Sequence, residues 1–447
     1  MQIQKGYRVI FQTYDLSTPT KTINEVCILE STMEAPTNCL NFSIGMENQI
    51  KLIQGVQDNV LNEKAKILAE ENSNTCRCCK GKLVKGGTQA TTFHDVFTDH
   101  KVIFQRSKCK ECNYEVPSTV RQLLGTIQSG ELQKIQSELG STHTYRESEH
   151  LFSMFSGGER YINNHDRIKQ VSESVGDALA KITQAEKEIV AISEVKELVL
   201  NVDGGHIKTT EDGLRSMEAI TSVIYQPNAI KSNNKGTYNH IESKNCAASI
   251  CDDKQEQIIC STIVAALKQG LGKSTHVTAL CDGAANCWNV VESLRPLCGS
   301  MTTILDWFHI GMKIENISLP QNLKEELLSV KWYLWRGNVD EALERLSQLA
   351  ALAKEEKHID RINKLYNYIT NNRDKIVNYE ERQQKGLVFT SNLAESTVES
   401  LINRRCKGHQ HMRWSREGLN PLLQIRAALH SKGEWSDKWQ TAVLNAA

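Results

Sequence analysis

Two pairs of cysteines in this 447-residue sequence have the spacing of metal-binding turns. Cys76 and Cys79 form one CxxC pair, Cys109 and Cys112 form the other, and a tight turn within each pair lets both sulfurs reach one ion. Four thiolates suit tetrahedral Zn²⁺, so these four residues are the predicted zinc ligands. Cys78 is a rival ligand in the first pair, where CRCCKG displaces the glycine expected directly after the second cysteine. The alternative interpretation is a set of buried thiols without a metal.

Acidic residues recur where strands are expected to end. Asp203 and Asp282 each terminate an apolar run and are followed directly by glycine, and Glu395 comes later in the chain. Residues at strand ends often act in function because the sheet is rigid while the following loop leaves the site open. Clustered carboxylates favour a hard cation, Mg²⁺ or Mn²⁺, and two such ions can activate an attacking oxygen and stabilise the leaving oxygen of a phosphodiester. A lone aspartate at a strand end is more often a helix cap, so the prediction depends on the whole set in order.

Cationic residues gather just beyond Glu395. They interleave with an indole and comprise Arg404, Arg405, Lys407, His409, His411, Arg413, Trp414 and Arg416. A cationic stretch beside metal-binding acids would hold a phosphate backbone against the site. From this stretch alone a solvated basic face is an equally good interpretation, and its position beside Glu395 favours DNA.

The elements that position these residues follow from hydrophobic periodicity. In the first part of the chain we expect short strands within 1–45, a helix over 46–71, a β-hairpin over 82–106 and helices over 119–193. The hairpin would bring the two cysteine pairs together. Residues 145–180 fit a helix-turn-helix with Gly157 and Gly158 near the turn, although their net acidity weakens the case for a DNA reader.

The hydrophobic pattern changes after residue 196. Strands are expected at Glu197–Asp203, Ser216–Tyr225, near Cys246–Cys251, at His276–Cys281 and at Met301–Leu305, with helices at 255–271 and around Trp288. Residues 312–385 are helical and charged in pattern. The alternation of strands and helices predicts an α/β fold with Asp203 and Asp282 at strand ends.

Total charge conceals where charge lies. The chain has 53 basic and 53 acidic residues, which argues at first against a DNA-binding protein. The charge is segregated, however, with a net charge of +5 over residues 76–122 and +4 from residue 396 onwards. Neutrality therefore does not exclude DNA. The sequence also predicts no signal peptide and no membrane span, and the cysteine usage fits a cytoplasmic protein with a metal site.

The motifs together resemble a known family. VDGG at Asp203, LCDGA at Asp282, LDWFH at Asp306–His309 and SNLAES around Glu395 are similar, in order and spacing, to the motifs of DDE transposases of bacterial insertion sequences. Within these the chain resembles the Mutator-like group, and most closely the ISKra-type families. The segment that begins at Glu395, ESTVESLINRRCKGHQHMRWS, is similar to the closing motif of that family, and the resemblance covers about residues 76–435.

The resemblance implies an RNase H-like fold, a mixed five-stranded sheet flanked by helices. It places Asp203 on the first strand, Asp282 after the fourth strand and Glu395 on a late helix, as catalytic residues that bind Mg²⁺. Asp306 and His309 match the Asp-x-x-His signature of the family, and His309 is expected among the DNA contacts with Arg404, Arg405, Lys407, Arg413 and Trp414. Asp306 is the rival of Asp282, and Glu399, one helical turn on, is the rival of Glu395.

The implied domain order runs from an N-terminal region to a short tail. The expected segments are an N-terminal region at 1–72, a zinc ribbon at 73–118, helices at 119–193, the catalytic domain at 194–311 and 387–435, a helical insertion at 312–386 and a tail at 436–447.

The function implied is that of a DNA transposase, which cuts the ends of an element and joins the 3′-hydroxyl to target DNA. The expected partners are double-stranded DNA and further copies of the chain in a homo-oligomer, and the expected place of action is the nucleoid. Two alternatives remain at this point: an RNase H-like nuclease without strand transfer, and a non-catalytic zinc-dependent DNA-binding protein derived from a transposase.

Overall fold

A computed structural model describes most of the chain. The described residues are 5–39, 42–71, 75–156, 158–186, 193–232, 239–250, 254–408 and 412–446. The chain divides into two compact units, unit 1 with residues 1–172 and 443–447, and unit 2 with residues 173–442. No helix among the described residues is long and apolar enough to cross a membrane.

Unit 1 begins with two β-hairpins and a long helix between them in sequence. Its elements are β1 (Lys5–Asp15), β2 (Thr18–Met33), α1 (Met46–Glu71), β3 (Leu83–His94), β4 (Asp99–Cys109), α2 (Val120–Leu124), α3 (Gly130–Thr142) and α4 (Tyr145–Phe155), followed by the start of α5 (His165–Ala185). The helix predicted over 46–71 and the hairpin predicted over 82–106 are confirmed. The strands predicted within 1–45 are wrong in length, because they form a ribbon with strands of 11 and 16 residues.

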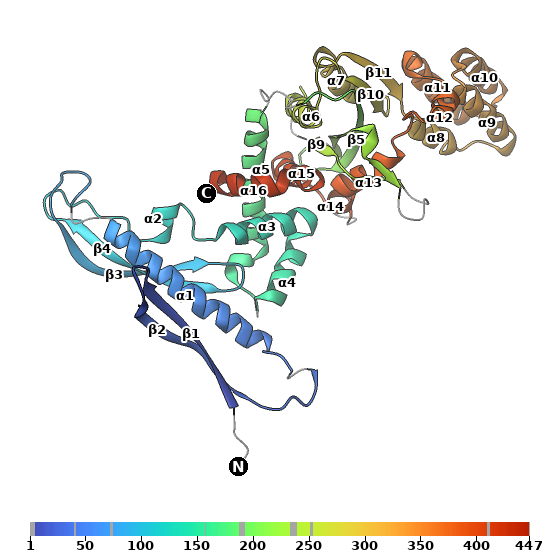
Figure 1. Ribbon diagram of the computed structural model, residues 1–447. Coiled ribbons are helices and arrows are strands. Elements are labelled where there is room, and N and C mark those ends of the chain that lie inside the picture. Colours follow the sequence, from blue (N-terminus) through green and yellow to red (C-terminus); the bar gives the residue numbers. More distant parts are fainter. Residues whose placement is uncertain are drawn as a thin grey trace. The chain divides into compact units, whose positions relative to one another are not determined.

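Helix α1 supplies the cover that both hairpins need. It contacts β2 on one hairpin and β4 on the other (Figure 1). Its apolar face joins a small core with the second hairpin, in which Ala65, Val102, Phe104 and Val120 are buried. An isolated two-stranded ribbon is marginally stable in water, so packing against α1 is what makes these hairpins persist.

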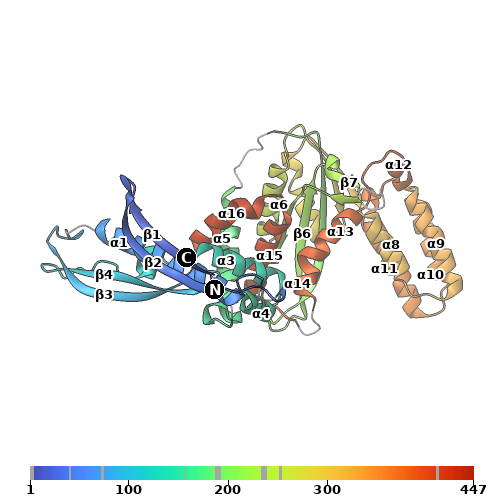
Figure 2. The ribbon, with the colours of Figure 1, turned by 60° about the horizontal axis from the view of Figure 1, so that its bottom comes forward.

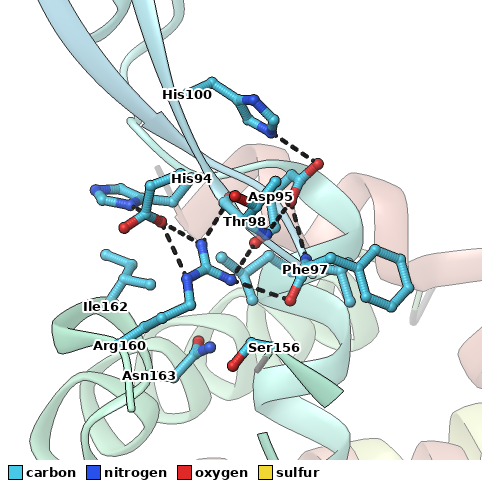
Figure 3. A network of polar contacts seen from close by, with 12 residues as sticks. His94, Asp95, Phe97, Thr98, His100, Ser156, Arg160, Ile162 and Asn163 are labelled. Atoms are coloured by element: carbon cyan, nitrogen blue, oxygen red, sulfur yellow. Dashed lines mark hydrogen bonds and ion pairs between the residues drawn. The ribbon is translucent and has the colours of Figure 1, made fainter. Parts of the chain in front are cut away.

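The tip of the β3–β4 hairpin is fixed by one guanidinium. Arg160, from the segment between α4 and α5, donates to the carbonyl oxygens of Asp95, Val96 and Thr98 and to the carboxylate of Asp99 (Figure 3). Although burial opposes the change, hydrogen bonds from His94 and Arg160 lower the pKa of Asp99 to about 2. This contact joins the hairpin to the helices of unit 1.

His94 and His100 lie between the two cysteine pairs in the sequence. His94 Nδ1 lies 2.7 Å from Asp99 Oδ1, and Nδ1 of the buried His100 ring lies 2.8 Å from Asp58 Oδ1. On its other side, His100 Nε2 lies 2.9 Å from Asp95 Oδ2 (Figure 3). Both rings therefore have carboxylate partners within unit 1, as a packed strand residue would.

Unit 2 is built on a mixed β-sheet. Its strands are β5 (Glu197–Lys208), β6 (Ser216–Tyr225), β7 (Ile230–Ser232), β8 (Asn239–Ile241), β9 (Asn245–Ser249), β10 (His276–Cys281) and β11 (Ser300–Leu305). Among the described residues five of them form one sheet in the order β11-β10-β5-β6-β9, while β7 and β8 form a separate hairpin. Strands β10 and β11 run parallel to β5, whereas β6 runs antiparallel to both of its neighbours. The predicted mixed α/β architecture and all five strand positions are confirmed.

Helices cover both faces of this sheet. The helices after β9 are α6 (Glu256–Lys268), α7 (Ala285–Glu292), α8 (Trp307–Glu315), α9 (Gln321–Trp335), α10 (Val339–Leu352), α11 (Glu356–Asn371), α12 (Tyr379–Gln384), α13 (Asn392–Val398), α14 (Arg404–Cys406), α15 (Arg416–His430) and α16 (Glu434–Ala446). Of these, α6, α7, α13 and α15 contact the strands of the sheet. Figure 2 shows α6 beside β6 on the flank of the sheet, and the hydrogen bond between Ser222 and Thr262 joins these two elements at 2.7 Å. Helix α13 packs against β6, and α15 packs against β9.

Two close approaches show which helix lies on which face of β5. A Cβ added at Gly204 would lie 3.6 Å from Cys287 Sγ of α7, whereas one added at Gly205 would lie 3.8 Å from Ile402. Successive side chains of a strand point to opposite faces, so α7 lies on one face and the segment after α13 lies on the other. Asp203 shares the second face with Gly205.

The predicted helical stretch 312–385 is confirmed and is anchored by aromatic rings. Figure 2 shows α9, α10 and α11 side by side, and α10 packs on both neighbours. At the root of this stretch the rings of Trp307 and Trp335 lie 4.8 Å apart, and Tyr379 donates a buried hydrogen bond to the Leu305 carbonyl at 2.7 Å. This cluster brings the chain back to the end of β11, where residues 389–395 continue.

Candidate metal centres

Four cysteine sulfurs converge at the base of the β3–β4 hairpin. Cys76 and Cys79 precede β3, whereas Cys109 ends β4 and Cys112 follows it. The Sγ atoms of Cys76 and Cys112 are 3.6 Å apart, those of Cys79 and Cys109 are 3.5 Å apart, and all four atoms lie within 4.8 Å of one another. Tetrahedral Zn²⁺ with bonds of about 2.3 Å needs sulfurs roughly 3.8 Å apart, so this donor set fits zinc.

The geometry also answers the question left open at Cys78. That side chain is exposed and outside the cluster, while its backbone N–H donates to Cys76 Sγ at 3.3 Å. Lys80 and Asn113, which directly follow the two cysteine pairs, have φ of 63° and 61°. Glycine is the usual residue in this left-handed region, so Lys80 adopts the conformation that the displaced glycine would otherwise take.

A second cluster joins three elements of unit 2 that are far apart in the sequence. Asp203 comes from β5, His309 from the first turn of α8 and Glu395 from α13. Their ligand atoms all lie within 4.8 Å of one another, and His309 Nε2 is 3.6 Å from Asp203 Oδ1. All three side chains are half-buried, so each can face both the protein and a bound ion. Two predicted metal ligands, Asp203 and Glu395, are thus brought together.

Asp306 organises the side of this cluster that faces the protein. Its side chain is almost fully buried; Oδ1 accepts from the backbone N–H groups of Phe308 at 3.2 Å and Ser391 at 2.9 Å. Oδ2 accepts from Ser391 Oγ at 2.6 Å and lies 2.8 Å from His309 Nδ1. Ser391 Oγ is also 3.0 Å from Glu395 Oε1. Asp306 therefore positions the cluster, and its oxygens are already engaged.

The rival of Glu395 lies elsewhere. Glu399 is exposed, and its carboxylate accepts a hydrogen bond from Asn403 in the π-helical segment η7 (Glu399–Asn403). Of these two acids it is Glu395 that lies in the cluster with Asp203.

Asp282 lies beside this cluster without joining it. It follows β10, whose last residue pairs with Val202 of β5, so Asp282 and Asp203 come after neighbouring paired positions. Burial raises the pKa of Asp203, and the charge of Asp282 adds to this effect. A carboxylate oxygen of Asp282 lies instead within 4.8 Å of the sulfurs of Cys281 and Cys287.

The cluster is electrostatically poised for a cation. Burial, followed by the charges of Glu395 and Asp282, raises the pKa of Asp203 to about 6, against the opposing effect of His309. Burial also raises the pKa of Glu395. Burial would lower the pKa of His309, but its hydrogen bond to Asp306 and the surrounding acids raise it to about 9. A divalent cation would offset the cost of burying these carboxylates and the repulsion between them. An oxygen-rich donor set fits Mg²⁺ or Mn²⁺.

The predicted DNA contacts divide by exposure. Arg404, Lys407 and Arg413 are exposed. Lys407 Nζ lies 3.4 Å from the position of a Cβ at Gly205, on the face of β5 that carries Asp203. His409 and His411 lie outside the described residues.

Arg405 and Trp414 are buried, with exposed fractions of 3% and 8%. The Arg405 guanidinium lies 4.8 Å from the centre of the Trp414 ring, whose Nε1 donates to the Cys406 carbonyl at 3.3 Å. The Trp414 backbone also bonds to Lys208 and Thr210 at the end of β5. These two residues therefore pack against each other, and Trp414 holds this part of the chain against the end of β5. The exposed Arg404 and Arg413 are their direct neighbours in the sequence.

Two residues that contact the site are not among those predicted from the sequence. Ser391 precedes Glu395 by four residues in SNLAES, a helical spacing that was the available signal. Tyr368 of α11 donates to the Asp282 carbonyl at 2.8 Å, a contact that depends on how the insertion folds and leaves no signal in the sequence. His309, predicted among the DNA contacts, lies within the carboxylate cluster.

Comparison with known proteins identifies the family. Residues 136–441 match the model of UPF0236, described as an uncharacterised protein family. The chain belongs to this family. The UPF0236 match includes every residue of the carboxylate cluster and begins after the four cysteines. No curated protein matches the chain.

Proposed function

We propose that this protein is a DNA transposase of a bacterial insertion sequence, with an RNase H-like catalytic domain in unit 2. The observation that carries the proposal is the convergence of Asp203 and Glu395 in one cluster, with Asp282 following the neighbouring parallel strand. Acids from the first strand, the fourth strand and a late helix are what the resemblance to DDE transposases requires.

The sheet supports the proposal independently. Counted along the sheet in chain order, its strands lie in the order 3-2-1-4-5 with only the second strand reversed, and a mixed five-stranded sheet is what the resemblance implies. The long helical stretch between β11 and α13 fits an insertion between the second and third acids. The full set of domain boundaries expected from the sequence remains part of this proposal.

The residues have separable roles in this function. Asp203, Asp282 and Glu395 would hold Mg²⁺, which when bound supplies activation of the attacking oxygen and stabilisation of the leaving oxygen. Asp306 and Ser391 hold His309 and Glu395 in place through the hydrogen bonds described above. Arg404, Lys407 and Arg413 would bind the phosphate backbone, and Lys407 is best placed because it lies over Gly205. The four cysteines would hold a structural Zn²⁺ in a ribbon.

Double-stranded DNA, as element ends and as target, is the partner that follows from this activity. Because two ends must be joined to one target, the active form would be a homo-oligomer that works at the nucleoid.

The test is strand transfer with a divalent cation. Asp203→Ala should lower joining of a 3′-hydroxyl DNA end to target by about 10³-fold or more, because an interaction made with the reacting centre is lost. Asp212→Ala, an exposed acid in the same region, is the matched control and should keep full activity. Full activity in Asp203→Ala would overturn the assignment.

The same assay separates the alternatives. Cleavage of DNA without joining of a supplied 3′-hydroxyl end would indicate a nuclease, whereas DNA binding without any divalent-dependent cleavage would indicate a non-catalytic binding protein.

A further inference from the structure

Asp282 has sulfur neighbours that the proposed function does not use. Cys281 ends β10 and Cys287 lies in α7, and both thiols are buried, with exposed fractions of 1% and 0%. Their Sγ atoms and an Asp282 carboxylate oxygen all lie within 4.8 Å of one another. Cys281 Sγ is 3.6 Å from Asp282 Oδ1.

A tight turn creates this arrangement. Gly283 has φ of 96°, and a Cβ there would lie 2.8 Å from the Tyr368 ring and 3.0 Å from Leu305, so only glycine fits. The Asp282 carboxylate also accepts from the Ala284 backbone N–H at 2.9 Å. The reversal carries the chain into α7 and returns Cys287 to β5, where its Sγ lies 3.6 Å from the position of a Cβ at Gly204.

The two cysteines and the carboxylate cluster lie on different sides of Asp282. Gly204, which faces Cys287, and Asp203, which faces Glu395, are consecutive residues of β5 and so point to opposite faces of the sheet. Asp282 interacts with both sides, through Cys281 on one and through the charge it exerts on Asp203 on the other. One carboxylate is therefore shared between a set of soft donors and a set of hard donors.

We propose that Cys281, Cys287 and Asp282 form a binding site for a thiophilic divalent cation, Zn²⁺ or Cd²⁺. Two thiolates and one carboxylate supply three positions of a tetrahedron and leave the fourth open, a donor set that selects such ions over Mg²⁺. Binding replaces two thiol protons by one cation and releases those protons. Asp282 is half-buried, and Ala285 and Asn286 at the start of α7 are exposed.

When Zn²⁺ or Cd²⁺ is bound, Asp282 is no longer available as a ligand of Mg²⁺. Binding of the thiophilic ion thus inhibits the Mg²⁺-dependent reaction. The binding itself depends only on the geometry of the three side chains, whereas this inhibitory consequence rests on the proposed function.

The first experiment counts tight Cd²⁺ sites in the full-length chain by thiolate-to-cadmium absorption. The wild type should bind two equivalents, one at the four cysteines of unit 1 and one at Cys281 and Cys287. Cys287→Ala should bind one equivalent, and Cys287→Ser, which keeps the side-chain volume, guards against misfolding of the alanine variant. Cys246→Ala, which removes a buried strand thiol outside these clusters, should still bind two. Equal stoichiometry in the wild type and both Cys287 variants would overturn the site.

The second experiment measures Mg²⁺-dependent nicking of a supercoiled plasmid as Cd²⁺ is added. One equivalent beyond that held by the four cysteines of unit 1 should lower wild-type nicking at least about tenfold, while Cys287→Ala resists the added ion. Equal inhibition of both proteins would overturn the competition for Asp282. Absence of nicking in every protein at any Cd²⁺ level would count against the proposed function, and the cadmium stoichiometry would still decide whether the site exists.

Discussion

The four cysteines of unit 1 and the carboxylate cluster of unit 2 are assembled in opposite ways. The cysteines come as two pairs, each closed by a local turn, and a single hairpin brings the pairs together. The cluster of Asp203, His309 and Glu395 draws one residue from each of three elements, and two of these elements are separated by the whole helical insertion.

The two sites gain their stability from different sources. The cysteine site lies at the base of a single hairpin, where binding of Zn²⁺ would contribute directly to the free energy of folding. The carboxylate cluster is held by the buried sheet and by the hydrogen bonds of Asp306, so its geometry persists while its charges repel. Loss of the metal should therefore disturb the first site structurally and the second site electrostatically.

The largest effect should follow removal of a cysteine ligand. Cys109→Ser is expected to abolish zinc binding and to lower the free energy of unfolding of the β3–β4 region by several kcal/mol, because structural zinc contributes roughly 10 kcal/mol in small domains. Hydrogen exchange of the β3 and β4 amides measures this, with β5 amides as the internal reference. Cys78→Ser is the matched control and should keep its zinc. If Cys109→Ser still bound zinc, the four cysteines would not form the predicted zinc site.

Asp306→Asn tests whether hydrogen bonds hold the carboxylate cluster. The asparagine oxygen can replace one carboxylate oxygen, but its amide NH₂ would face Ser391 Oγ and His309 Nδ1, where an acceptor is needed. We expect Mn²⁺ affinity to fall by about 10–100-fold and stability by about 1–3 kcal/mol. Calorimetric titration with Mn²⁺ measures the first effect, and the exposed Asp374→Asn should leave it unchanged. Unaltered affinity in Asp306→Asn would show that the sheet alone positions the site.

The metal-free carboxylate cluster should make stability depend on pH. His309 has a pKa raised from 6.5 to about 9, so its protonated form stabilises the fold fully below pH 6.5, and this contribution is lost as pH rises through about 9. The loss should reach at most about 3 kcal/mol, and denaturant unfolding at several pH values in a chelator measures it. His309→Gln should flatten the curve across this window. A wild-type curve already flat between pH 6.5 and 9 would contradict the ion pairing of His309.

The smallest effect should come from a cation at the rim. Lys407→Ala is expected to weaken DNA binding by about 3–10-fold and to reduce the slope of log affinity against log salt by about 1, because one phosphate contact is lost. Fluorescence anisotropy with a DNA duplex measures both quantities. Lys354→Ala, an exposed lysine at the end of α10, is the control. If the two variants had the same DNA affinity and the same salt slope, DNA would not bind beside the carboxylate cluster at Lys407.

Most of the strands and helices and the cluster of four cysteines could be predicted from the sequence. Periodicity located the five strands of the sheet and the helical stretch 312–385, because alternating and helical patterns report which face of a local segment is buried. The CxxC spacing identified the four cysteines, because their geometry is fixed within a few residues of each pair. It could not settle Cys78, since that choice depends on which thiol the turn at Lys80 directs inward.

The different positions of the acidic residues depend on packing and could not be predicted from the sequence. Asp306 and Asp282 look alike in the sequence, each following an apolar strand. In the fold Asp306 is buried under hydrogen bonds from Phe308, Ser391 and His309, while Asp282 lies half-buried between Asp203 and two thiols. Arg405 and Arg404 are adjacent in sequence, yet one is enclosed against Trp414 and the other faces solvent. Spacing along the chain sets what a residue can reach, but burial and partners come from segments that meet only when the sheet and the insertion have packed.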